Sequence, residues 1–215
     1  MLFKDRSEAG RILAGRLTAY AGRDDVAVLG LPRGGVPVAA EAARALQAPL
    51  DVFIVRKIGA PQQPELALGA IASGDVQVVN WYAVDALHIS EGTFNAIVAR
   101  ERAEIARRER EYRDGRALPP LDGKTVILID DGLATGATML AAVQALRQLA
   151  PARIVVAVPV AAADTCAELR RDVDEIVCAA TPEPFYGVGM WYQDFTQTSD
   201  TEVRQLLADA SRKAG

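Results

Sequence analysis

Histidine, cysteine and long apolar runs are scarce in this sequence, and each shortage narrows what the protein can be. Among 215 residues there are one histidine and two cysteines, Cys166 and Cys178, so no Cys/His cluster exists for a structural zinc ion. So few cysteines suit a reducing cytoplasm, and we expect both as buried apolar packing residues. The most apolar stretch, residues 154–163, is about half as long as a membrane-spanning helix must be.

We expect no targeting segment, and the sequence has no excess of positive charge. The first ten residues mix four charged side chains with no apolar run, which predicts no secretory signal. Lysine and arginine number 24 against 28 aspartates and glutamates, so the net charge of −4 gives no general attraction for nucleic acid. We therefore expect a cytoplasmic protein with neither a membrane nor a nucleic acid as partner. With 50% of its residues apolar, the chain can bury a core as a single domain.

Short apolar runs alternate with segments of helical periodicity along most of the chain. The elements expected in the first half are a helix over 5–21, a strand over 26–31, a helix reaching Gln47 and a strand over 50–55. Two prolines and a glycine make residues 57–68 look like a loop. The strands and helices expected in the second half are 125–130, 138–149, 153–160, 164–171 and 174–179. This alternation predicts an α/β fold with an open, mostly parallel sheet and helices on both faces.

A long charged segment, residues 90–114, interrupts this alternation. Val98, Ile105 and Tyr112 recur seven residues apart, and glutamate–arginine pairs four residues apart add helical support. The pattern predicts a helix that lies on the domain or pairs with a second copy of the chain, and we expect a homodimer. Because acidic and basic residues are interleaved, the segment does not resemble a nucleic-acid-binding helix.

The segment 126–139, VILIDDGLATGATM, combines features of a phosphate site and of a sugar site. Its apolar start predicts a buried strand, and Asp130 and Asp131 follow at the carboxyl end, where open α/β sheets bind ligands. Two adjacent carboxylates are costly to desolvate unless a cation or hydroxyl groups meet them. Gly132 and Gly136 allow close backbone approach before a helix whose first N–H groups can donate to an anion. Acceptors for sugar hydroxyls beside donors for a phosphate indicate a pentose 5-phosphate site.

Other nucleotide-binding motifs fit the sequence less well. A Walker B strand needs a Walker A partner, yet the sequence contains no G-x-x-x-x-G-K-[ST], and a G-x-G-x-x-G dinucleotide fingerprint is absent as well. From these residues alone, a plainer alternative stays open. It is a strand that ends in two solvated acids and runs into a capped helix.

An apolar strand, two acids and a T-G-x-T turn together resemble the phosphoribosyl-diphosphate (PRPP) motif of the type I phosphoribosyltransferases. The resemblance implies that Asp130 and Asp131 bind the ribose hydroxyls. It also implies that five residues of the turn wrap the 5-phosphate, namely Ala134, Thr135, Gly136, Ala137 and Thr138.

The same resemblance implies a layout for the whole chain. Residues 1–215 are expected to form one phosphoribosyltransferase domain, with a core over about 22–180. A helical insertion over about 81–116 is not part of the common family pattern. A small hood is expected from residues 1–20 and 182–215.

Basic and glycine residues elsewhere are implied to hold the leaving diphosphate. The segment LPRGGVP (31–37) is similar to the family's pyrophosphate loop, so Arg33, Gly34 and Gly35 are expected to face that group. Arg56 and Lys57 end the next strand, as an Arg-Lys pair does in adenine- and orotate-type relatives, where such residues reach diphosphate oxygens.

Two further segments are implied to lie near the acceptor. The expected loop after Lys57 lies where the family has its mobile catalytic lid, and Glu65 is the carboxylate there that could act near the base. The tail EPFYGVGMWYQDF resembles the hood of purine-type members, which implies that Tyr186 and Val188 contact the base.

The activity implied is Mg²⁺-dependent transfer of the 5-phosphoribosyl group from PRPP to a nitrogen acceptor such as a nucleobase, with release of diphosphate, as in nucleotide salvage. Asp130, Asp131 and Glu65 are the implied catalytic residues. Asp130, Asp131 and Asp194 are the implied Mg²⁺ ligands, although Asp194 lies one residue beyond the expected spacing. Two departures argue against hypoxanthine and guanine as acceptors: Ala134 replaces an acid of the phosphate loop, and a lysine expected beyond the next strand is missing.

Two other functions stay open at this stage. The first is a PRPP-sensing regulatory protein that keeps the site without turnover. Family members with that role bind nucleic acid through added basic surfaces or domains, and from the acidic balance of this sequence we expect neither. The second is hydrolysis of a phosphate ester, or phosphorolysis of a nucleotide, at the same site.

Overall fold

A five-stranded sheet lies at the centre of the computed structural model, which describes residues 2–61 and 63–213 apart from the side chains of residues 64, 65 and 213. The strand order is β2-β1-β6-β7-β8, and every neighbouring pair is parallel. The strands are β1 (Val26–Gly30), β2 (Leu50–Val52), β6 (Thr125–Ile129), β7 (Arg153–Val160) and β8 (Glu175–Ala180). The predicted open parallel sheet is confirmed.

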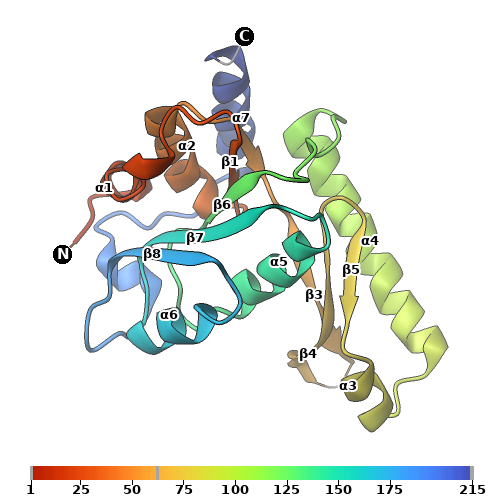
Figure 1. Cartoon of the computed structure of the whole chain (residues 1–215). Helices are drawn as coiled ribbons and strands as arrows, with labels where there is room; N and C mark the ends of the chain where they lie inside the picture. Colours follow the sequence, from red (N-terminus) through yellow and green to blue (C-terminus); the bar gives the residue numbers. More distant parts are fainter. Residues whose placement is uncertain (1, 62, 214–215) are drawn as a thin grey trace.

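Helices cover both faces of this sheet, because successive strand residues point to opposite sides and both sets are apolar. On β6, Ile127 packs on one face and its neighbour Leu128 on the other, and both side chains are fully buried. The covering helices are α1 (Arg6–Ala14) and α2 (Gly35–Leu46) on the first face, and α5 (Ala137–Arg147) and α6 (Ala163–Leu169) on the second. Figure 1 shows these three layers.

A second, antiparallel sheet stands beside the first and was not expected from the sequence. It consists of β3 (Val55–Ala60), β4 (Gln63–Ala72) and β5 (Val76–Val79). The prediction of a loop over 57–68 is therefore wrong, and the expected strand over 50–55 is divided between the two sheets. Ile58 and Leu68 are buried against Phe94 of the long helix α4 (Glu91–Arg113), so packing outweighs the prolines and glycine that suggested a loop.

The helix predicted over 90–114 is confirmed as α4. Ser90 caps it, since its Oγ accepts a hydrogen bond from the Thr93 backbone N–H at 3.2 Å. A short helix that the sequence pattern did not indicate, α3 (Trp81–Ala86), precedes it. No helix in the described part of the chain combines the length and the apolar character that a bilayer crossing requires.

The two ends of the chain have separate neighbours. Phe3 forms a parallel bridge with Tyr192, and the two pack with Ala9 and Val160 beside the short helix η2 (Val188–Trp191). The C-terminal helix α7 (Asp200–Lys213), part of the segment predicted as the hood, packs against α2, α4 and β2. The helix expected over 5–21 ends early, because α1 stops at Ala14 and a 3-10 turn, η1 (Thr18–Tyr20), follows.

Cys166 and Cys178 were expected as separate packing residues, but the structure pairs them. Their sulfur atoms are in contact between α6 and β8, and their Cα atoms lie 7.6 Å apart. Cys166 also belongs to the core under α5 and α6, so the expected burial of this side chain is confirmed.

Candidate functional site

The acid pair lies directly after β6, at the carboxyl edge of the main sheet. The side chain of Asp130 accepts a hydrogen bond from the backbone N–H of Asp131 at 2.8 Å. The Asp131 carboxylate forms an ion pair with Arg6, and the Arg6 Nε donates a hydrogen bond to Asp131 Oδ2 at 2.8 Å. The phenol of Tyr192 donates to the Asp131 backbone carbonyl at 2.6 Å, which ties the hood to the same residue.

Arg6 is the part of the site that the sequence analysis missed. Its side chain is only 11% exposed, and it also donates to the Thr196 carbonyl at 2.7 Å and lies 4.1 Å from the centre of the Phe195 ring. From the two adjacent carboxylates we predicted that a cation or hydroxyl groups would contact them. No local signal indicated which cation, since Arg6 lies 125 residues before Asp131.

The predicted diphosphate turn packs against the acid pair. A Cβ added to Gly34 would lie 2.1 Å from Asp131 Oδ2, and one added to Gly35 would lie 2.5 Å from the Ile129 carbonyl oxygen. Real Cβ atoms do not approach this closely, so a side chain at Gly34 would displace the carboxylate. Residues 31–37 and 126–139, expected to act on one substrate, thus meet in space.

The turn over 132–138 is open to solvent over residues 134–138, whereas Leu133 before them is buried. Ala134, Thr135, Ala137 and Thr138 are all exposed. Gly136 caps α5 with a φ of +69°, a conformation that favours glycine. Among the described residues, none accepts a hydrogen bond from the backbone N–H groups of residues 134–138. These donors, at the positive end of a helix, can therefore bind an anion.

Electrostatics at the acid pair oppose full ionisation. Burial raises the pKa of Asp130 well above its ordinary value, and repulsion from Asp131 raises it further. Burial also raises the pKa of Asp131, although the hydrogen bond from Arg6 lowers it in part. One guanidinium faces two carboxylates, so the pair retains affinity for a second cation or for hydroxyl donors.

An Asp130→Asn variant is expected to be more stable than the wild type at pH 7, by about 0.5–2 kcal/mol. The raised pKa means that ionised Asp130 costs stability above that pKa, and that this cost vanishes below the ordinary value of about 3.9. The difference in melting temperature, roughly 2–4 °C per kcal/mol, should therefore shrink as pH falls toward 3.5. Thermal melts at both pH values test this, and equal stability at pH 7 would contradict it.

The basic side chains predicted to bind the diphosphate have different neighbours in the structure. Arg33 Nη1 lies 3.8 Å from Asp200 Oδ2 on α7. Arg56 Nε lies 2.8 Å from Glu101 Oε2 on α4, and the pair lines a cavity of about 840 Å³ between β3 and α4. Lys57 lines this cavity too, and it lines a second one, of about 570 Å³, that reaches the start of α5.

The hood residues divide between the site and the surface. Val188 packs against Gly132, at the entrance of the phosphate turn. The ring of Tyr186 is 78% exposed. Asp194 is exposed, and hydrogen bonds from the side chain and backbone of Thr196 lower its pKa.

One predicted site residue, Asp194, lies apart from the acid pair, and the side chain of another, Glu65, is not described. Among the side chains that the structure describes, no three of histidine, cysteine, aspartate or glutamate gather closely enough to bind a metal ion, so Asp194 does not join Asp130 and Asp131. Glu65 lies outside the described side chains, although its backbone belongs to β4.

Known proteins resemble this chain in sequence. A family model described as a phosphoribosyl transferase domain matches residues 5–189. Two Mycobacterium tuberculosis proteins, named "Putative phosphoribosyl transferase" MT0597 and Rv0571c, are 48% identical to this chain over 211 residues. The match covers 98% of this chain and 47% of each relative, so the chain spans about half the length of these relatives.

Solved structures show the same architecture. The crystal structure of TT1426 from Thermus thermophilus is 42% identical, with a TM-score of 0.86 over 97% of this chain and 99% of that chain. AQ2163 from Aquifex aeolicus, at 13% identity, gives a TM-score of 0.51 over 94% of this chain and 85% of its own, which is a likeness of fold alone.

Proposed function

The chain belongs to the phosphoribosyl transferase domain family, and we propose that it transfers a 5-phosphoribosyl group from PRPP to a nitrogen acceptor, releasing diphosphate. One observation carries the proposal. The open turn over 132–138 presents helix N-terminal N–H groups directly after two carboxylates that face an arginine. A phosphate on the turn and ribose hydroxyls on Asp130 and Asp131 would use both sets of groups.

The donors of the turn are sufficient to hold a phosphate. Each hydrogen bond to a charged oxygen contributes about 1.5–3 kcal/mol net, so a few of them can offset the cost of desolvating the ligand. Thr135 and Thr138 add exposed hydroxyls to the backbone donors. When ionised, the carboxylates of Asp130 and Asp131 accept hydrogen bonds and donate none, which suits the two adjacent hydroxyls of a ribose.

Transfer at this site needs no protein nucleophile. The bond between ribose C1 and the diphosphate oxygen breaks, a bond from C1 to the acceptor nitrogen forms, and the proton of that nitrogen leaves to solvent or base. Diphosphate departs with the bonding electrons, so Arg33, Arg56 and Lys57 are proposed to stabilise its growing charge. The acid pair and the turn would hold the ribose in position as the bond breaks.

The family implies a magnesium ion, and the residues present fit one. Asp130 and Asp131 are hard oxygen donors whose mutual repulsion a cation would relieve, and Mg²⁺ is usually held by one or two carboxylates together with substrate phosphates. When bound, the ion would neutralise charge on the leaving diphosphate. We propose these two residues as its protein ligands and leave Asp194 out, because it lies apart from them.

The acceptor is proposed to be a nitrogen compound other than hypoxanthine or guanine. Ala134 has no carboxylate with which to assist a 6-oxopurine, and Pro159 and Val160 end β7 where a lysine would read the oxo group. The exposed ring of Tyr186 is available to stack on a planar base.

Diphosphate release tests the proposal. The purified protein is mixed with PRPP, Mg²⁺ and one acceptor at a time, taken from the nucleobases and a set of small amines. We expect release with at least one acceptor and little with hypoxanthine or guanine. Tight PRPP binding without release for any acceptor would contradict the transferase and favour a regulatory protein that senses PRPP.

A further inference from the structure

The insertion helix α4 contacts the proposed diphosphate site through its buried face. Ile105 and Tyr112 are 5% and 2% exposed and pack in one cluster with Val36, in the first turn of α2, and Val203 of α7. The last turn of α4, the first turn of α7 and the first turn of α2, which follows Arg33 in the chain, therefore share one hydrophobic core. This places the insertion against the segment that the sequence analysis assigned to the leaving group.

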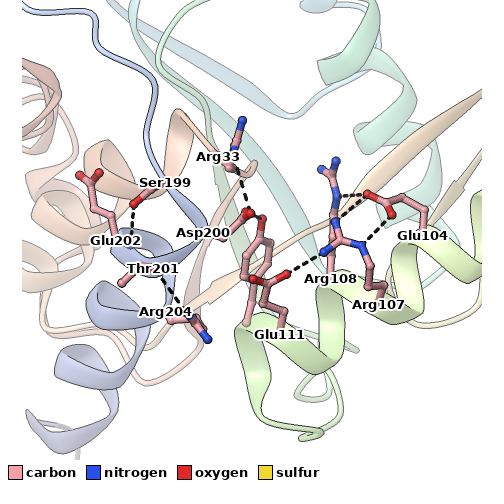
Figure 2. Close-up of polar contacts among 11 residues, drawn as sticks. Arg33, Glu104, Arg107, Arg108, Glu111, Ser199, Asp200, Thr201, Glu202 and Arg204 are labelled. Carbon is pink, nitrogen blue, oxygen red and sulfur yellow. Dashed lines mark hydrogen bonds and ion pairs between the residues drawn. The ribbon is translucent and has the colours of Figure 1, made fainter.

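A polar relay crosses this core from α4 to Arg33. The Tyr112 hydroxyl donates to Asp200 Oδ1 at 2.5 Å, and Asp200 Oδ2 lies 3.8 Å from Arg33 Nη1. Figure 2 shows Arg33 directed at Asp200, which opens α7 just after Ser199. Burial raises the pKa of Tyr112 and the hydrogen bond to Asp200 raises it further, so the hydroxyl stays protonated and keeps donating.

The two halves of the relay have different strengths. The hydrogen bond from Tyr112 is short, partly buried and made to a charged group, so it fixes the orientation of the Asp200 carboxylate. The contact from Asp200 to Arg33 exceeds hydrogen-bonding distance, and both side chains are about one-third exposed. Within the described chain, the Arg33 side chain makes no hydrogen bond, so its donors can turn to an anion while Asp200 restrains the group.

We propose that Tyr112 and Asp200 are positioning residues, which hold Arg33 where the diphosphate of PRPP binds. The inference rests on the proposed function, since it presumes that Arg33 meets this group. It gives the insertion a role: α4 fixes a carboxylate of α7, and that carboxylate sets the place of a cation on the turn after β1. Neither residue is proposed to touch the substrate.

Tyr112→Phe is the direct test, because it removes the hydroxyl while keeping the ring and all charges. Affinities for PRPP, inorganic diphosphate and ribose 5-phosphate are measured calorimetrically in the presence of Mg²⁺. We expect PRPP and diphosphate to bind about 3- to 10-fold more weakly, as for loss of one hydrogen bond, and ribose 5-phosphate to bind as in the wild type. A variant damaged in its fold would instead lose affinity for all three ligands.

Two controls complete the experiment. Glu111→Gln changes the residue beside Tyr112, on the same helix and paired with Arg107, and should leave all three affinities unchanged. In an Arg33→Met background, Tyr112→Phe should not weaken PRPP binding further, because the guanidinium that Tyr112 and Asp200 position is already absent.

The results separate the two proposals. If the wild type binds the three ligands and Tyr112→Phe matches it for each, the relay is refuted and the transferase proposal stands. Equal weakening for all three ligands, or an undiminished effect in the Arg33→Met background, also refutes the relay. If the wild type binds neither PRPP nor ribose 5-phosphate, the proposed function fails and the relay fails with it.

Discussion

An Asp131→Asn variant is expected to release diphosphate from PRPP at least about 100-fold more slowly than the wild type. The substitution keeps the shape of the side chain but removes the charge that faces Arg6 at 2.8 Å and, in our proposal, a ribose hydroxyl. Loss of one preorganised contact to a transition state typically has this magnitude. Initial rates at saturating PRPP and acceptor measure the effect.

A matched control separates chemistry from folding in this variant. Asp122→Asn makes the same change at an exposed aspartate just before β6, and it should keep the wild-type rate. Near-wild-type turnover in Asp131→Asn would remove this carboxylate from the reaction, and a rate loss shared by both variants would point to a nonspecific cause.

An Arg113→Ala variant is expected to lose about 3–5 kcal/mol of unfolding free energy. Arg113 ends α4 with a side chain only 2% exposed, and its guanidinium donates to Asp51 at 2.8 Å, to Glu109 at 2.8 Å and to the Val52 carbonyl at 2.5 Å. Removing the guanidinium leaves two carboxylates and a buried carbonyl without their partner. Urea unfolding followed by circular dichroism gives the change.

The exposed residue Arg110, one turn earlier on α4, provides the control for this loss. Arg110→Ala removes the same side chain from the surface and should change stability by less than about 0.5 kcal/mol. Arg113→Met should lose less unfolding free energy than Arg113→Ala, because the methionine side chain refills the space. It still leaves Asp51 and Glu109 without the guanidinium. A loss below about 1 kcal/mol in Arg113→Ala would mean that this network does not anchor α4.

The features that were predictable from the sequence are those encoded within a short stretch. The strand β6 (Thr125–Ile129), the two acids and the turn before α5 follow one another, so their order alone predicted a ligand site at the sheet edge. The family resemblance drawn from that stretch is confirmed, as is the parallel sheet, because buried strands carry apolar residues on both faces.

The features that were not predictable depend on distant contacts. Residues 57–68 form strands because Ile58 and Leu68 pack on α4, while their own sequence has the prolines and glycine of a loop. Tyr112 meets Asp200 across 88 residues of sequence, and periodicity shows that Tyr112 faces inward but not which carboxylate it meets.

A crystal structure with ribose 5-phosphate tests the central claim most directly. The account predicts the phosphate within hydrogen-bonding distance of the backbone N–H groups of residues 134–138, with ribose hydroxyls on the carboxylates of Asp130 and Asp131. A phosphate bound elsewhere, or a sugar turned away from both acids at full occupancy, would contradict the account.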